Sequence, residues 1–480
     1  MELISGAFLL FIAVVTAVYY ALPGKAKPVW LLIASLFFYV SADWRFLPFL
    51  LLSAGCTWLA ARKLPGSKRR KGLLWLTLAV DVGLLAVLKL LPFGWMFAGR
   101  FLGQLPELRF IYPLGIAFYS LQAAGYLIDV YRGKTQPEQS FWRFLLFMCF
   151  FPIISQGPIS RYEQLAPQLN EPHALQYKNL AYGAQLALWG FFKKLVIADR
   201  AAILVDQVYG NYTEYAGIAI FLAAVLYFIQ LYTDFSGCVD ICRGAAQMLG
   251  IELAENFRRP FLSASTQEFW RRWHISLSFW LRDYLYFPLG GSRLGKLRKN
   301  TNLLIVFTVS GIWHGTGLNY MLWGLLQGVY QIVGAATRGA RDSFWKKLRP
   351  DGAPRPLRQI GCFLILSLTA HIVRAPGLRT GWQMARAMAG GFSLKALTDG
   401  SLLALGLDGP DMLVLVLAMA LLLGVSLWQE KHVDALLRDR LAALPLGLRW
   451  GIWLVGLAAV LILGVYGPGY SSAQFIYMAF

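Results

Sequence analysis

The chain has 480 residues, of which 57% are hydrophobic and 15% are charged, and its mean hydropathy is +0.53. This much apolar surface excludes a water-soluble globular protein and indicates a polytopic membrane protein. The net charge of +20 does not indicate a nucleic-acid partner, because the basic residues stand in short loops beside apolar runs, where they set membrane topology.

Long apolar runs occur along the whole chain. Those at 3–22, 411–428 and 451–467 approach the length of about 20 residues that a helix needs to cross the hydrocarbon core. No basic residue precedes the first run, so it predicts a retained span and not a cleaved signal peptide. We therefore predict an all-α polytopic membrane protein with about 11 to 13 membrane-embedded helices, in which residues 1–480 form one integral-membrane domain.

Four basic loops are expected to face the cytoplasm, because positively charged residues accumulate on that side of a membrane protein. The stretch 375–410 and the N-terminus then lie on the outer side. The four loops are 61–72, 258–299, 337–358 and 431–440.

Polar side chains at membrane depth gather in a block between residues 112 and 330. A charged side chain at the bilayer centre costs roughly 2.5 to 3.5 kcal/mol on insertion scales, so such a cluster predicts a cavity lined by water or substrate. We expect the functional site in this motif-bearing block. Its polar residues are Gln122, Asp129, Gln156, Gln230, Asp234, Asp240, His274, Asp283, His314, Asn319 and Gln327.

The segment 266–286 combines tryptophan and arginine residues. An S-x-x-E capping box at residues 265–268 predicts the start of a helix. At about 100° per residue, the aromatic side chains fall on one face and Arg271 and Arg282 on the other, with His274 at the border. This pattern predicts an amphipathic helix at the membrane interface.

An apolar run at 302–328 is interrupted in its middle by glycine, tryptophan, histidine and asparagine. Two G-x-x-x-G pairs, starting at Gly311 and Gly324, allow helix backbones to approach closely. A histidine in such surroundings favours function over ordinary packing, so His314 is the strongest candidate for a reactive side chain. A structural or surface role is favoured for the remaining histidines, His173, His371 and His432.

The chain lacks the sequence motifs of several common kinds of enzyme site. The chain contains no G-x-x-x-x-G-K-[ST] nucleotide loop, no H-E-x-x-H metal pair and no G-x-S-x-G nucleophile elbow. No further ligands join Cys238 and Cys242 in a zinc pattern, so no metal site is predicted. A membrane histidine without an evident serine or cysteine partner can act as a general base toward a hydroxyl group. These residue types leave a membrane enzyme and a transporter as alternatives.

Longer motifs carry a family resemblance. The chain resembles the membrane-bound O-acyltransferase (MBOAT) family in "RRWHISLSFWLRDYLYFPLGG" (271–291) and "SGIWHGTGLNYMLWGLLQG" (310–328). Within this family it is similar to the bacterial branch that contains the alginate O-acetylation and teichoic-acid D-alanylation proteins. The resemblance extends to 112–133, to 150–169 and to the terminal "FIYMAF" (475–480), so it covers most of the chain.

The resemblance implies an MBOAT-type helical fold around a central tunnel, in a multi-pass protein of the bacterial plasma membrane. An acyl group would pass from a cytoplasmic thioester, acetyl-coenzyme A or an acyl carrier protein, to a hydroxyl group on the outer side. No permanently bound cofactor is expected, because the thioester is a substrate. His314 matches the essential histidine of the family and would deprotonate the acceptor hydroxyl. His274 matches the second polar position, and its role is either catalytic or structural.

Further residues are predicted to bind substrates. The arginines near His274 would line the cytoplasmic mouth, where the phosphates of coenzyme A or an acidic carrier protein would dock, unless they serve topology alone. Asp234 is expected to hold helices together or to contact substrate. The predicted substrate-binding residues are Trp313, Asn319, Arg271, Arg272, Arg282, Gln156 and Asp234.

The acceptor is predicted to be an extracytoplasmic polysaccharide of the cell envelope, and the acyl group to be acetyl. D-alanyl transfer from a carrier protein to teichoic acid is one alternative, and a transporter or flippase for a polymer precursor is another. A scaffold for an extracytoplasmic transferase is a third. The enzymatic alternatives also imply a partner transferase on the outer side of the bilayer.

Overall fold

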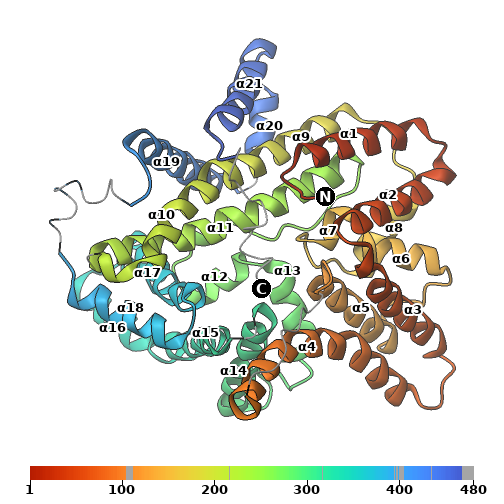
Figure 1. The fold of residues 1–480 in the computed structure, drawn as a ribbon, viewed down its shortest axis with the longest axis horizontal. Coiled ribbons are helices and arrows are strands. Elements are labelled where there is room, and N and C mark those ends of the chain that lie inside the picture. Colours follow the sequence, from red (N-terminus) through yellow and green to blue (C-terminus); the bar gives the residue numbers. More distant parts are fainter. Residues whose placement is uncertain are drawn as a thin grey trace. The chain divides into compact units, whose positions relative to one another are not determined.

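The computed structural model describes residues 1–103, 112–215, 217–315, 317–393, 395, 398, 400, 405–433 and 435–466. All regular secondary structure in these ranges is helical, which confirms the all-α prediction (Figure 1). The terminal motif at 475–480 lies outside the described residues.

Seven helical segments within the described ranges are long and apolar enough to cross a membrane. A further apolar helix, α1 (Gly6–Ala21), is shorter. The prediction of a polytopic membrane protein is therefore confirmed, whereas the count of about 11 to 13 embedded helices includes shorter segments and stays a prediction. The seven segments are Gly24–Ala42, Trp44–Lys63, Arg70–Leu91, Gly217–Met248, Arg355–Arg374, Gly409–Lys431 and Leu446–Leu463.

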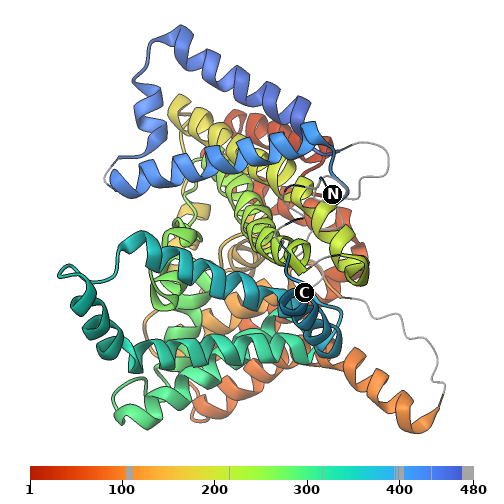
Figure 2. The same cartoon turned by 90° about the vertical axis from the view of Figure 1, so that its left-hand side faces the viewer.

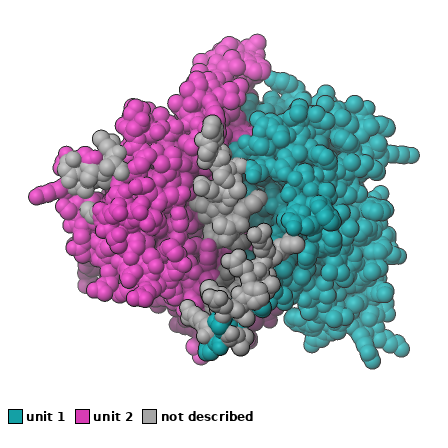
Figure 3. All heavy atoms as spheres, in the orientation of Figure 1, with its two compact units in different colours: residues 1–187, 238–255 teal, residues 188–237, 256–480 magenta. Residues whose placement is uncertain are grey.

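The chain forms two compact units, which Figure 3 shows in different colours. The first unit comprises residues 1–187 and 238–255, and the second comprises residues 188–237 and 256–480. The assignment of the whole chain to one integral-membrane domain stays a prediction.

The first unit has buried aromatic packing and one close turn. The rings of Phe8, Phe38 and Phe151 pack against one another with centroids 6.1 to 6.5 Å apart. Gly115 precedes α5 with a φ of +71°, and a side chain there would overlap the carbonyl oxygen of Ile154, so this turn requires glycine. The helices are α1, α2 (Lys27–Ala42), α3 (Leu47–Lys63), α4 (Arg70–Leu102), α5 (Ile116–Tyr131), α6 (Phe141–Cys149), α7 (Phe151–Ile154) and α8 (Tyr162–Asn170).

The second unit has an aromatic core, in which Phe228 packs on Phe269 and Trp273 with centroids 5.9 and 6.0 Å away. Its α14 and α15 lie side by side as an antiparallel hairpin (Figures 1 and 2). The helices are α10 (Asp199–Gly210), α12 (Thr266–Arg272), α13 (Ile275–Leu281), α14 (Gly295–His314), α15 (Leu318–Ala336), α16 (Arg338–Leu348), α17 (Arg355–Arg374), α18 (Leu378–Gly390), α19 (Gly409–Lys431), α20 (Leu437–Ala442) and α21 (Leu446–Leu463).

A few elements complete the description. The helices α9 (Tyr177–Phe191) and α11 (Gly217–Met248) contribute residues to both units. Two segments, Phe192–Ala198 and Arg282–Tyr286, are π-helical. Short 3₁₀ turns occur at Gly24–Ala26, Trp44–Phe46, Tyr212–Glu214 and Pro260–Leu262.

Candidate functional site

His314 is the last residue of α14, and the hairpin with α15 fixes its place. Gly315 leaves the helix in an extended conformation, with φ −170° and ψ 163°. A side chain on Gly311 would overlap the carbonyl oxygen of Tyr320, and one on Gly324 would lie 3.1 Å from the Cα of Gly311. The predicted close approach at the two glycine pairs is therefore confirmed, and it brings His314 against the first turns of α15.

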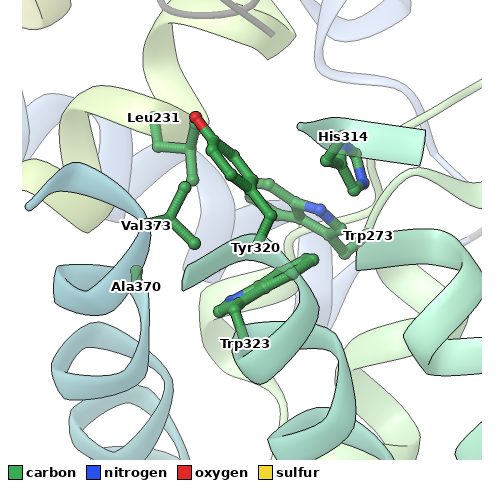
Figure 4. A pocket seen from close by; sticks show the side chains of 7 residues that line it. All are labelled: Leu231, Trp273, His314, Tyr320, Trp323, Ala370 and Val373. Carbon is green, nitrogen blue, oxygen red and sulfur yellow. The ribbon is translucent and has the colours of Figure 1, made fainter. Parts of the chain in front are cut away.

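A cavity of about 30 Å³ lies beside His314 (Figure 4). This is room for about one water molecule. The lining side chains come from α11, α14, α15, α17 and the residue that follows α12, and Figure 4 shows Tyr320 extending past Leu231 with its hydroxyl group. The described residues that line it are Leu231, Trp273, His314, Tyr320, Trp323, Ala370 and Val373. These side chains are mainly apolar and aromatic, and none of them is a carboxylate.

The prediction of one continuous amphipathic helix at 266–286 is wrong. The segment is mostly helical, but it is interrupted after Arg272. Its capping box is present, since the N–H of Glu268 donates to the Ser265 hydroxyl oxygen at 3.2 Å. The helix α12 then ends at Arg272, and α13 begins at Ile275. Between them His274 adopts a left-handed conformation with a φ of +43°, which is uncommon for a residue other than glycine.

Asn256 explains this break. A continuous α-helix would pair the N–H of Ser276 with the carbonyl of Arg272. Instead, the N–H of Ser276 donates to Asn256 Oδ1 at 2.9 Å, and the Arg272 carbonyl accepts the N–H of Arg258 at 2.8 Å. The N–H of Ile275 donates to the Asn256 carbonyl at 3.0 Å. A preceding chain segment thus takes the backbone groups that the helix would use, and the regular spacing of tryptophans and arginines does not reveal this.

The break turns His274 toward His314. The centroids of the two imidazole rings lie 6.2 Å apart at an angle of 57°. His274 is fully buried and packs edge to face against Phe235, at 4.9 Å, and against Trp313, at 6.0 Å. His274 lies outside the seven candidate spans, and its burial lowers its pKa to about 3, so the ring is neutral.

The indole rings of Trp313 and Trp323 frame His314 itself, with ring centroids 4.8 and 5.4 Å from the imidazole centroid. Both contacts are edge to face, with interplanar angles of 75° and 83°. His314 is 6% exposed, so it is held in the protein interior at the wall of the cavity.

Comparisons with known proteins decide the family. A model of the membrane-bound O-acyltransferase family matches residues 138–370. The chain is also 36% identical over 433 residues to a Pseudomonas aeruginosa protein named probable alginate O-acetylase AlgI, a match that covers 86% of this chain and 80% of the relative. The chain belongs to the membrane-bound O-acyltransferase family. It is therefore an acyltransferase and a multi-pass membrane protein.

Two other relatives of the acyltransferase are named for the transfer of different groups, acetyl in one and D-alanyl in the other. The peptidoglycan O-acetyltransferase of Helicobacter pylori is 33% identical over 414 residues, which cover 78% of this chain and 76% of the relative. The teichoic acid D-alanyltransferase of Bacillus subtilis is 29% identical over 253 residues, which cover 49% of this chain and 62% of the relative.

Arg272 of the acyltransferase is part of an ion-pair network. Its guanidinium group lies 2.6 Å from Glu268 and 2.8 Å from Glu430 of α19. Arg259 and Arg355 pair with the same Glu430 carboxylate at 2.9 and 3.0 Å. These contacts hold α12 to α17 and α19, so Arg272 has a structural role. Its contact with substrate stays a prediction.

The other two predicted arginines are exposed. Arg282 pairs with its neighbour Asp283 at 2.7 Å and lies over the ring of Phe279 at 4.5 Å. Arg271 is also exposed at the end of α12. Arg271 is therefore exposed to an anionic partner, whereas Arg282, although exposed, already pairs with Asp283.

Asn319 lies close to His314 in sequence, but its side chain contacts the C-terminal end of α17. Its amide nitrogen is 3.4 Å from each of three carbonyl oxygens, those of Ile372, Val373 and Ala375. The amide thus supports the C-terminal end of α17, where Val373 lines the cavity. Contact of Asn319 with substrate stays a prediction.

Asp234 forms a buried ion pair. Lys194, in the π-helical segment before α10, lies 2.8 Å from Asp234 and 2.7 Å from Asp199. This arrangement agrees with the expectation that Asp234 holds helices together, and Phe235, next in α11, contacts His274. The neighbouring lysines 193 and 194 in an apolar run were the sequence signal for this pair.

Gln156 belongs to the first unit, where it is buried in the turn after α7. The structure of the second unit brings together His314, His274 and Trp313, with Trp273, Tyr320 and Trp323 as additional residues that the sequence did not single out. Among the described residues, no group of three histidine, cysteine or acidic side chains is arranged to hold a metal ion.

Proposed function

We propose that this acyltransferase moves an acetyl group from a cytoplasmic thioester to a hydroxyl group of an extracytoplasmic polysaccharide, with His314 as the general base. The observation that carries the proposal is the position of His314, which is buried at the end of α14 on the wall of a cavity, with its ring centroid 6.2 Å from that of His274. The names of the relatives, alginate O-acetylase and peptidoglycan O-acetyltransferase, support the acetyl group and a glycan acceptor.

In the proposed reaction, a ring nitrogen of His314 accepts the proton of the acceptor hydroxyl while its oxygen attacks the thioester carbonyl carbon. The carbon–sulfur bond then breaks, and the proton passes from the imidazolium to the departing thiolate, so an ester and a free thiol are the products. Proton transfer of this kind requires that the imidazole of His314 is neutral when the hydroxyl group binds. The edges of Trp313 and Trp323 hold the ring in position during both steps.

His274 is assigned a positioning role in this proposal. It is fully buried between Phe235 and Trp313, and Trp313 in turn contacts His314. A neutral ring at this place supports the wall behind His314 without placing a positive charge beside it.

The cavity favours an uncharged acyl group. Among the described residues that line it, the wall is apolar and aromatic and has no carboxylate, so the ammonium group of a D-alanyl ester would be buried there without a counter-ion from these residues, which is costly. The exposed Arg271 and Arg282 are the proposed contacts for the phosphates of coenzyme A or for an acidic carrier protein.

The test is transfer by membranes that contain the full chain. Acetyl-coenzyme A with a labelled acetyl group and a carrier protein with labelled D-alanine are supplied in parallel, and label on an outer-face polymer is measured. We expect transfer of acetyl, abolished by His314→Ala and retained by His432→Ala, which removes an exposed histidine.

Three outcomes would contradict the proposal. Transfer of D-alanine and not acetyl would replace the acyl group and the branch. Unchanged thioester consumption in a membrane-inserted His314→Ala protein would favour a transporter of a polymer precursor. Full polymer acylation by that variant would favour a scaffold for another transferase.

A further inference from the structure

The turn between α3 and α4 in the first unit concentrates positive charge. The ten residues 62–71 contain six lysine and arginine residues and no acidic residue. Both flanking helices include candidate membrane spans, Trp44–Lys63 and Arg70–Leu91, so the turn that joins them lies at a membrane surface. Buried hydrogen bonds fix the two helices to each other, because Asp81 accepts from the hydroxyl groups of Ser53 and Thr57 at 2.6 and 2.7 Å.

A shallow, open surface cavity of about 730 Å³ lies along this turn. Its residues divide into a basic rim and an apolar wall. Arg62, Lys63 and Arg69 provide the positive charges, and Leu73 and Leu76 of α4 provide the apolar surface. Gly72, in the first turn of α4, also lines the cavity and adds the positive end of the helix dipole.

The charges of the rim are not neutralised within the described chain. None of the six cationic side chains at 62–71 forms an ion pair with a described residue. Arg62 lies over the ring of Trp58 at 4.9 Å, and Arg70 donates to the carbonyl of Tyr131 at 3.0 Å, but neither contact removes a charge. The preference for positive charge in cytoplasmic loops explains why the turn is basic. It does not explain why three of the cationic side chains line one cavity together with two leucine side chains.

We propose that this cavity binds the headgroup phosphate of an anionic phospholipid, with an acyl chain lying along Leu73 and Leu76. The positive charges of the basic rim attract the phosphate. A free phosphate ion has no apolar part that could contact the leucines, so the apolar wall favours a lipid. Leu76 and the adjacent Trp75 are 67% and 63% exposed, which leaves their apolar surface open to an acyl chain. The site is independent of the acyl transfer proposed for His314.

The test is equilibrium binding of phosphatidylglycerol, labelled on an acyl chain, to the full chain in detergent, followed by fluorescence anisotropy. Unlabelled phosphatidylglycerol, phosphatidylcholine and inorganic phosphate serve as competitors. We expect phosphatidylglycerol to compete and the other two to fail. The triple variant R62Q/K63Q/R69Q should bind about a hundredfold more weakly, because it removes all three positive charges of the rim that attract the phosphate.

A matched variant, K346Q/K347Q/R349Q, removes three exposed cations at the end of α16 and should bind as the unaltered protein does. The unfolding midpoint without lipid shows that both variants are folded. Wild-type affinity in the first variant, or equal competition by phosphatidylcholine, would overturn the site. Equal competition by inorganic phosphate would replace the lipid by a soluble anion.

Discussion

His314 and His371 are buried histidines of the same unit, yet their surroundings differ. They are 6% and 3% exposed, and each lies in the last turn of its helix, α14 or α17. The ring of His371 is bonded at both nitrogens, with Nδ1 2.8 Å from the Tyr209 hydroxyl and Nε2 3.2 Å from the Gly381 carbonyl oxygen. His314 instead lies on the wall of a cavity, among aromatic rings.

This difference shows why burial alone does not identify a reactive histidine. A carbonyl oxygen can only accept, so Nε2 of His371 carries the proton and Nδ1 accepts from the Tyr209 hydroxyl. With both nitrogens used, His371 holds α10 and the start of α18 to α17, as its predicted structural role requires. Ala370 and Val373, on either side of it in sequence, line the cavity, whereas His371 does not.

The largest expected effect is a loss of acyl transfer when His314 is replaced, whereas replacement of His371 should reduce stability. His314→Gln should lower acyl transfer by about 10²- to 10⁴-fold, the usual contribution of a positioned base, and leave the unfolding midpoint nearly unchanged. His371→Ala should destabilise the fold by about 1–3 kcal/mol for each partner that it leaves unpaired, with activity per folded molecule retained. Transfer assays and denaturant unfolding of both purified variants provide the measurements. Equal losses of activity in the two would remove the distinction.

The fold and the site were predictable where the signal is local. Apolar runs gave the helices, and the spacing of glycines 311, 315, 324 and 328 gave the close hairpin, because a missing side chain is a property of the residue itself. The break at His274 was not predictable, since Asn256, almost 20 residues earlier, takes the hydrogen bonds of the helix. The aromatic residues of the cavity converge from helices distant in sequence, and only the fold brings them together.

A smaller effect is expected for the partner of His371. Tyr209→Phe removes the hydroxyl that donates to Nδ1, and one unpaired buried group costs about 1–2 kcal/mol of unfolding free energy. Acyl transfer per folded molecule should not change, because Tyr209 is not among the residues that line the cavity. Tyr212→Phe is the matched control, since that hydroxyl is exposed and bonds to Gln383 at 3.1 Å. A loss of transfer in Tyr209→Phe without a loss of stability would assign this pair to the reaction.

The third buried histidine, His274, sharpens the comparison through pH. Its pKa is about 3 in the folded protein because of burial, against about 6.5 in an unfolded chain. The unfolded state therefore takes up a proton as the pH falls below 6.5 and the folded state does not, so stability present above pH 6.5 is lost progressively toward pH 3. Between pH 7 and 5.5 this one group should lower the unfolding free energy by about 1 kcal/mol.

The variant His274→Asn should flatten this dependence, whatever it does to stability at neutral pH. His432→Asn, which removes an exposed histidine, should keep the slope of the unaltered protein. Unfolding free energies at several pH values between 7 and 5.5 give the three slopes. If His274→Asn and the unaltered protein have the same slope, His274 is protonated to the same extent in both states, and the neutral ring proposed behind His314 has to be abandoned.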